Sequence, residues 1–264
     1  YNSYSFTTFL FIGNLILGLL SILFLNKKRA YRIFTYLMGL SWLILTFTLA
    51  LRWIINGTIP IANGYETMLL LSWLIMIVSI LTTYKLQLMT TFGLLMSGFM
   101  LLVSHLGEMD PSITPRMPVL NSPLLSIHVS IIMISYALFS LTFICAIAYF
   151  LTYRSKKANI IQTNKQLTTL SQIFLYPAIT TLGLGIFIGA IWANISWGTY
   201  WGWDPKETWA LITLMVYAIV LHKQSLPTFR KPLNYHLYMI IAFLSILMTY
   251  FGVNYVLGGM HSYA

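Results

Sequence analysis

Long runs of apolar residues recur along the whole chain and are separated by short polar connections. A helix needs roughly 20 apolar residues to cross a hydrocarbon layer about 30 Å thick. The runs are continuous and do not alternate between polar and apolar positions, so they are typical of helices and not of barrel strands. The pattern predicts an all-α integral membrane protein, a bundle of about eight transmembrane helices. The eight runs are approximately residues 6–25, 33–55, 67–84, 87–104, 123–151, 172–194, 205–222 and 236–257.

Composition supports a membrane protein. Of the 264 residues, 58% are hydrophobic and only 8% are charged, whereas a soluble domain has about a quarter of its residues charged. No soluble domain fits between the apolar runs, so residues 1–264 are interpreted as one transmembrane domain. The first run is too long for a signal-peptide core. The single cysteine, Cys145, excludes internal disulfides and is expected to be a core thiol.

Basic residues are distributed unequally between the two sides of the predicted bundle. Twelve of the 15 lie in alternate connections, and only Arg52, Arg116 and Lys206 lie on the opposite side. Basic connections stay in the cytoplasm, so both termini are expected on the outer side, together with all five carboxylates. The net charge of +10 therefore reflects topology in a lipid bilayer, and no nucleic acid is expected as a partner.

One outer connection differs from the rest of the chain. Residues 197–209, "WGTYWGWDPKETW", are called here the signature segment. Asp204, Pro205 and Glu207 predict the start of the seventh helix, with Asp at the N-cap, Pro at the first position and Glu closing a capping box. The segment also gathers five aromatic residues. An interfacial belt would spread them over many helix ends, so the cluster favours a surface for a large, flat, amphipathic ligand. The five are Trp197, Tyr200, Trp201, Trp203 and Trp209.

Three histidines are candidate ligands. His128, about five residues into the fifth run, and His261, in the C-terminal tail, are both expected on the outer side. Two imidazoles near an aromatic surface match the axial ligands of a haem iron. His222 ends the seventh run about 27 Å from Asp204, near the opposite membrane face. One helix would therefore link the outer aromatic segment to an inner histidine, an arrangement that suggests transport between two sites. The alternatives are interfacial side chains for the first two and a helix-capping histidine for His222.

The two remaining histidines receive structural interpretations. His105, in "SHLGEMDPSITPRMP", is expected in an irregular outer loop, with a spare ligand as the alternative. His236, near the inner start of the last run, is expected to have a surface role, with a ligand of the inner site as the alternative.

The signature segment matches the pattern W-G-x-x-W-x-W-D-x-x-E-[TN]-W of the WWD haem-handling proteins of cytochrome c maturation. With its eight runs and the tail "YFGVNYVLGGMHSYA", the chain resembles the CcsA-type System II cytochrome c haem lyases over nearly its whole length. The resemblance implies that His128 and His261 are external haem ligands and that His222 belongs to an inner site. The residues that match the pattern are Trp197, Gly198, Trp201, Trp203, Asp204, Glu207, Thr208 and Trp209.

The resemblance also implies a function: transport of haem b across the membrane and its covalent attachment to the CXXCH motif of apocytochrome c, with no acid, base or nucleophile of the usual kind. The implied partner is a Ccs-one/CcsB subunit, which would supply the second inner histidine. The missing initiating Met favours a fusion with that partner. The implied location is a bacterial inner membrane or a plastid thylakoid membrane.

Three alternatives compete with this function. A CcmC-like protein would deliver haem without forming thioethers. Proteins of that type resemble a six-span protein and lack a histidine corresponding to His222, so the eight runs of this chain favour the CcsA type. An electron carrier such as a cytochrome b subunit would need paired histidines inside the membrane, whereas His128 and His222 lie near opposite faces. A plain transporter leaves the signature segment unexplained.

Overall fold

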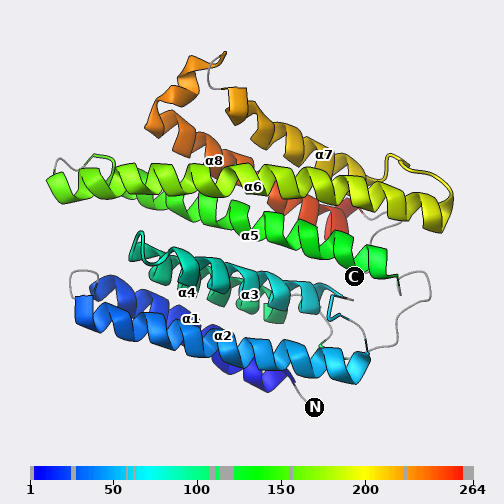
Figure 1. Ribbon diagram of the computed structural model, residues 1–264, viewed down its shortest axis with the longest axis horizontal. Coiled ribbons are helices and arrows are strands. Elements are labelled where there is room, and N and C mark those ends of the chain that lie inside the picture. The colour runs from blue at the N-terminus through cyan, green and yellow to red at the C-terminus, as the bar shows by residue number, and fades with distance from the viewer. Residues whose placement is uncertain are drawn as a thin grey trace. The chain divides into compact units, whose positions relative to one another are not determined.

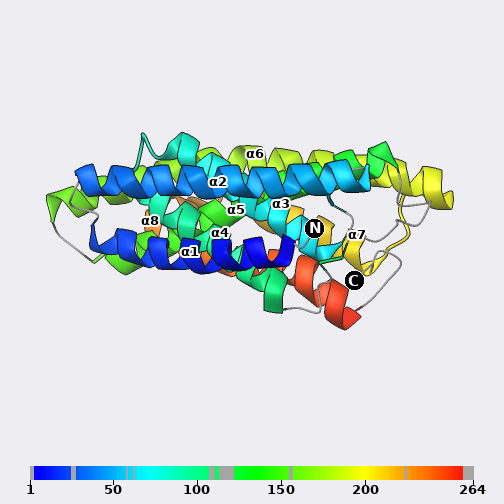
Figure 2. The same cartoon turned by 90° about the horizontal axis from the view of Figure 1, so that it is seen from below.

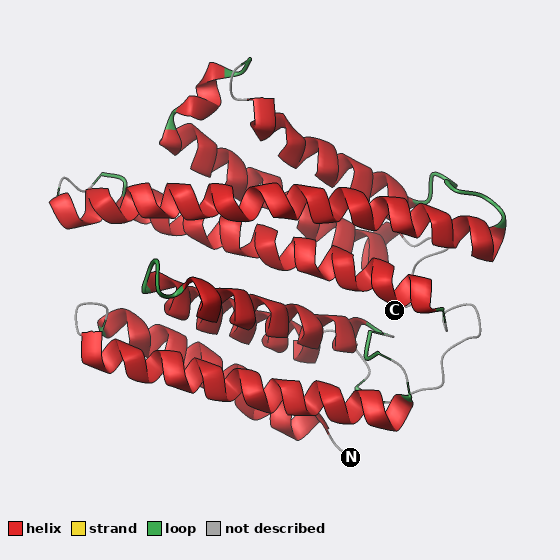
Figure 3. Cartoon of the chain, viewed as in Figure 1, coloured by secondary structure: helices red, strands yellow, loops and turns green. Residues whose placement is uncertain are grey.

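A computed structural model describes residues 3–24, 28–57, 59–61, 63–106, 111–112, 122–154, 157–222 and 225–257. Throughout these ranges the regular structure is helical and no strand occurs (Figure 3). The all-α class is therefore confirmed. The chain divides into two compact units, residues 1–122 and residues 123–264. Whether they act as one functional domain stays a prediction.

The described part of the first unit contains four helices, coloured blue to cyan in Figure 1. Buried polar side chains on α1 recur every seven residues, and each one hydrogen-bonds to α4. Thr7 contacts His105 at 3.4 Å, Asn14 contacts Ser97 at 3.2 Å and Ser21 contacts Thr91 at 2.7 Å. Such bonds fix how two helices pair inside a membrane, where apolar packing alone is unspecific. The helices are α1 (Ser3–Leu23), α2 (Lys28–Asn56), α3 (Gly64–Thr82) and α4 (Leu88–Leu106).

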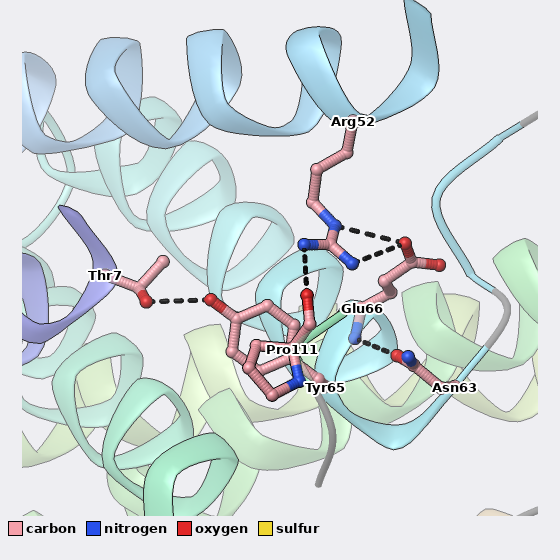
Figure 4. A network of polar contacts seen from close by, with 6 residues as sticks. All are labelled: Thr7, Arg52, Asn63, Tyr65, Glu66 and Pro111. Carbon is pink, nitrogen blue, oxygen red and sulfur yellow. Dashed lines mark hydrogen bonds and ion pairs between the residues drawn. The ribbon is translucent and has the colours of Figure 1, made fainter. Parts of the chain in front are cut away.

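A buried ion pair joins α2 to α3 in this unit (Figure 4). The Arg52 Nε and Nη2 atoms donate to Oε1 of Glu66 at 3.1 and 2.9 Å, and both side chains are almost completely buried. Arg52 Nη1 also donates to the carbonyl of Pro111 at 2.9 Å, and its guanidinium lies 5.2 Å from the centre of the Tyr65 ring. The pair therefore ties the connection after α4 to the ends of α2 and α3.

The second unit holds the remaining elements, coloured green to red in Figure 1. The helices α5 and α6 lie side by side, and the shorter α7 is followed by a 3-10 turn. The last helix, α8, continues as a π-helix. The elements are α5 (Pro123–Thr152), α6 (Ala158–Trp197), α7 (Pro205–Ala218), η2 (Ile219–His222), η3 (Pro227–Arg230), α8 (Pro232–Leu247) and η4 (Met248–Leu257).

Seven helices of the described chain are long and apolar enough to cross a membrane, which confirms an integral membrane protein. The eighth expected span, residues 205–222, is divided between the 14 residues of α7 and the four of η2. At about 1.5 Å per residue, α7 alone is about 21 Å long, shorter than the ~30 Å hydrocarbon layer.

The start of α6 differs from the sequence prediction. An apolar span was expected from residue 172, but α6 begins at Ala158 and has 40 residues. Its first turns are polar and were interpreted as a connection. They are helical because one face packs on α5: Asn164 is buried, and its Oδ1 accepts a 2.7 Å hydrogen bond from Thr152.

Candidate functional site

The signature segment connects the end of α6 to the start of α7. Figure 1 shows it turning back from the end of α6, and Figure 2 shows the same turn from below. Gly198 makes this reversal. Its φ of +79° lies in the left-handed region that favours glycine, and its N–H donates to the Asn194 carbonyl at 2.9 Å. The glycine of the pattern therefore ends α6.

The two carboxylates of the segment hold its backbone in place. Asp204 is the N-cap of α7 and accepts from the Lys206 N–H at 3.0 Å. Glu207 completes the capping box, and its Oε2 accepts from the backbone N–H groups of Asp204 at 3.3 Å and Gly202 at 2.8 Å. The predicted capping box is thus confirmed. Both acids position the aromatic residues between them and α6.

Trp203 is the residue most exposed by this arrangement. It has a φ of +56°, the single positive φ of a non-glycine residue in the described part of the chain. Its side chain is 72% exposed, and that of Tyr200 is 61% exposed. Strain of this kind persists where the surrounding structure enforces it, and it gathers at binding sites. The Trp203 indole is therefore held exposed to the outside although its backbone has a strained φ.

Two of the other signature tryptophans make edge-on ring contacts. The half-buried Trp201 meets Trp203 edge-on, with ring centres 5.9 Å apart. Trp197, the last residue of α6, makes an edge contact of 4.8 Å with Trp192. The side chain of Trp192 is 2% exposed, so it anchors the segment. The sequence analysis missed Trp192, although a tryptophan only five residues before the signature segment was a signal.

The last two residues of the pattern lie in the first turns of α7. Thr208 Oγ1 donates to the Trp203 carbonyl at 3.5 Å. Trp209 is half-buried, and its carbonyl accepts from Thr249 of η4 at 3.2 Å. The C-terminal helix is therefore attached to the base of the signature segment.

His128 lies on α5 and faces α6. Its Nδ1 is 2.7 Å from the carbonyl oxygen of Gly185. A carbonyl only accepts, so Nδ1 donates and carries the ring proton, and Nε2 is the nitrogen with the lone pair. This is the tautomer in which a histidine binds iron while its other nitrogen is held by the backbone. The donor chemistry of His128 thus fits a haem ligand, and its role stays a prediction.

His222 is exposed at the end of η2, and its Nδ1 donates to the Ala218 carbonyl at 3.1 Å. It therefore lies at the opposite end of α7–η2 from Asp204, as the spacing predicted. His261 lies outside the described residues. In the described chain no group of three or more His, Cys, Asp or Glu side chains gathers as a metal site.

The interpretations of His105 and His236 were wrong. His105 is in the last turn of α4, with Nδ1 2.8 Å from the Leu101 carbonyl and Nε2 3.1 Å from Thr8 Oγ1. The Gly- and Pro-rich sequence after it suggested a loop, but contacts with α1 extend the helix. His236 is fully buried, with its ring stacked 4.2 Å from that of Tyr149.

The helices and the signature segment together define a multi-pass, all-α membrane protein with an exposed aromatic connection. The sequence model of a family described as "Cytochrome C assembly protein" matches residues 61–261. The chain belongs to this family and has a role in cytochrome c biogenesis. The matched range contains all three candidate histidines.

Individual relatives agree with this assignment. The chain is 37% identical to Protein NrfI of Wolinella succinogenes over 97% of its own length, but it spans only 29% of NrfI. It is 33% identical to the cytochrome c biogenesis protein CcsA of Chlamydomonas reinhardtii, covering 86% of the chain and 67% of that protein. With CcsA of Guillardia theta it shares 30% identity over 99% of the chain and 95% of that protein. The resemblance to CcsA-type proteins is confirmed.

Proposed function

We propose that this protein carries haem b across the membrane and attaches it covalently to the CXXCH motif of apocytochrome c. The observation that carries the proposal is the signature segment, in which a capping box and a glycine turn hold Trp203 exposed at a strained backbone angle. A flat exposed indole offers a stacking surface to a macrocycle. His128 is eligible as an iron ligand because its Nδ1 is held by a carbonyl.

The proposed ligand roles follow the sequence hypothesis. His128 and His261 bind the iron on the outer side, and His222 belongs to the inner site. Gly189 of α6, against which His128 packs, precedes Trp197 by eight residues, or about 12 Å of helix. One helix therefore sets the spacing between the outer ligand and the aromatic segment.

The attachment step joins a cysteine thiol of the CXXCH motif to a vinyl group of haem. Each addition forms one C–S bond and transfers the thiol hydrogen to the second vinyl carbon, so nothing leaves. The protein's contribution is to hold both partners in register, which replaces a bimolecular encounter by a local one. The reactivity of the iron is a property of the haem itself, and the protein supplies binding and orientation. The proposed partners are apocytochrome c and a Ccs-one/CcsB subunit that supplies the second inner histidine.

Covalent haem on a co-expressed apocytochrome c tests the proposal. We expect a cytochrome that keeps its haem through denaturing electrophoresis, and a purified protein with a haem spectrum. A protein that binds haem but leaves the cytochrome unmodified would match the alternative, CcmC-like delivery. A colourless protein would contradict both functions and favour a transporter.

The proposed location is a bacterial inner membrane or a thylakoid membrane, with both termini on the outer side. Reporter fusions after Lys157 and after Lys231 are expected to report the cytoplasmic side. Fusions at Ser112 and after Ala264 should report the outer side, because the basic residues gather in alternate connections. A cytoplasmic report at Ala264 would contradict the external role of His261.

Asp204→Ala is expected to lower haem content and to weaken folding slightly. The substitution removes the N-cap of α7, which typically costs about 1 kcal/mol, and it releases one end of the signature segment. Asp204→Asn is the matched control because Asn caps helices as well as Asp, so it should keep the segment in place. Haem per protein and protein yield are the measurements. Full yield and full haem content in the Ala variant would show that the segment does not depend on its cap.

A further inference from the structure

Two glycines on α6, Gly185 and Gly189, leave gaps in the helix surface, called here notches. Each notch is filled by a side chain of α5. A Cβ atom added at Gly185 would lie 2.5 Å from Cδ1 of Ile132. A Cβ atom added at Gly189, one turn further along, would lie 2.5 Å from Cε1, 2.8 Å from Nδ1 and 3.2 Å from Nε2 of His128. The spacing is the G-x-x-x-G arrangement that allows close approach of membrane helices. Here one notch holds an aliphatic side chain, and the other holds an imidazole.

The two α6 contacts restrict His128 in different ways. The Gly185 carbonyl, 2.7 Å from Nδ1, fixes which nitrogen carries the proton. Gly189 leaves the space in which the ring lies, so it fixes where the ring plane sits against α6. No real Cβ atom approaches other atoms as closely as 2.5 Å, and the residue it would meet is a ring held by a backbone bond rather than the end of a flexible chain. A methyl group at position 189 therefore displaces the imidazole.

The same stretch of α6 also holds the aromatic segment. Trp192 lies three residues after Gly189, is 2% exposed and contacts Trp197 edge-on at 4.8 Å. A continuous helix from Gly185 to Trp197 thus carries the acceptor for His128, the notch for its ring and the anchor for the signature segment. Any movement of the ring against α6 changes its position relative to the aromatic surface.

We propose that Gly189 is a positioning residue for haem ligation, because its missing side chain leaves the space in which the His128 imidazole is seated against α6. The inference rests on the proposed function, in which His128 is an iron ligand. In this inference α5 supplies the ligand, His128, and α6 orients it.

The test compares Gly189→Ala with Gly183→Ala in the full chain together with its natural partner. Alanine is the better helix former at both positions, and among the described residues a Cβ atom at Gly183 would meet only Leu214 Cδ1, at 4.0 Å. We expect Gly189→Ala to lose the visible spectrum of a haem with two imidazole ligands and to lower cytochrome c assembly on the order of 10²-fold. Added imidazole should restore the spectrum. Gly183→Ala should keep both the spectrum and the assembly activity of the unmodified protein.

A double variant separates positioning from packing. In His128→Gly the ring is absent, so adding Gly189→Ala should cause no further loss of assembly, and the folded amount should equal that of His128→Gly alone. A Gly189→Ala protein with an unchanged spectrum would overturn the inference, and so would a double variant that fails to fold. If His128→Gly itself leaves the spectrum unchanged, the proposed ligand role is what fails. The two failures are therefore distinguishable.

Discussion

Replacement of His128 by glycine is expected to abolish cytochrome c assembly, and added imidazole is expected to restore it in part. The glycine removes the ring but leaves the aromatic segment and its supports intact, because Trp197, Trp201 and Trp203 make their contacts without His128. An open coordination position then remains beside a formed binding surface, and free imidazole fills it. The measurement is covalent haem on a co-expressed apocytochrome c, with and without imidazole.

His261→Gly is expected to behave in the same way, since the two histidines are proposed to bind one iron. His105→Gly and His236→Gly serve as controls of a different kind. Both side chains pack within their own unit, so their loss should lower the amount of folded protein without any response to imidazole. An imidazole response in His105→Gly and none in His128→Gly would contradict the assignment of the outer ligand.

Features specified within a few residues could be predicted from the sequence. The capping box needs only Asp204, Pro205 and Glu207 in the right order, and the structure contains it as expected. The apolar runs likewise predicted the helices, because crossing a membrane imposes length and composition on each segment separately. The turn at Gly198 was not predicted, although the left-handed φ of a glycine is equally local.

Features that depend on distant partners could not be predicted. His105 appeared to be in a loop because Gly and Pro follow it, and its helical position depends on Thr7 and Thr8, nearly 100 residues earlier. His236 is buried because the ring of Tyr149 and the hydroxyl of Thr168 come from two other helices. The candidate site shows the same division. The candidate ligand His128 was proposed from the sequence, whereas the close approach at Gly189 could be seen only from the packing of α5 on α6.

Arg52→Leu is expected to produce the largest loss of stability, about 3–5 kcal/mol, the usual cost of removing one member of a buried ion pair. The Glu66 carboxylate receives two donors from Arg52, at 2.9 and 3.1 Å, and the side chains of both residues are at most 2% exposed. Removal of the guanidinium also takes the 2.9 Å donor from the Pro111 carbonyl. The measurements are the yield of folded protein in detergent and its unfolding temperature.

The double variant Arg52→Leu/Glu66→Leu provides the comparison that identifies the cause. Replacing both members of a buried pair by apolar residues is often neutral, whereas removing one is strongly destabilising. The double variant should therefore recover most of the lost stability, with a remaining deficit from the Pro111 carbonyl. Arg52→Lys should lie between the two, because an ammonium keeps the charge but lacks the planar fork that reaches Glu66 and Pro111 together. If the single and double variants lose the same stability, the cost comes from packing at position 52 and not from the loss of the ion pair with Glu66.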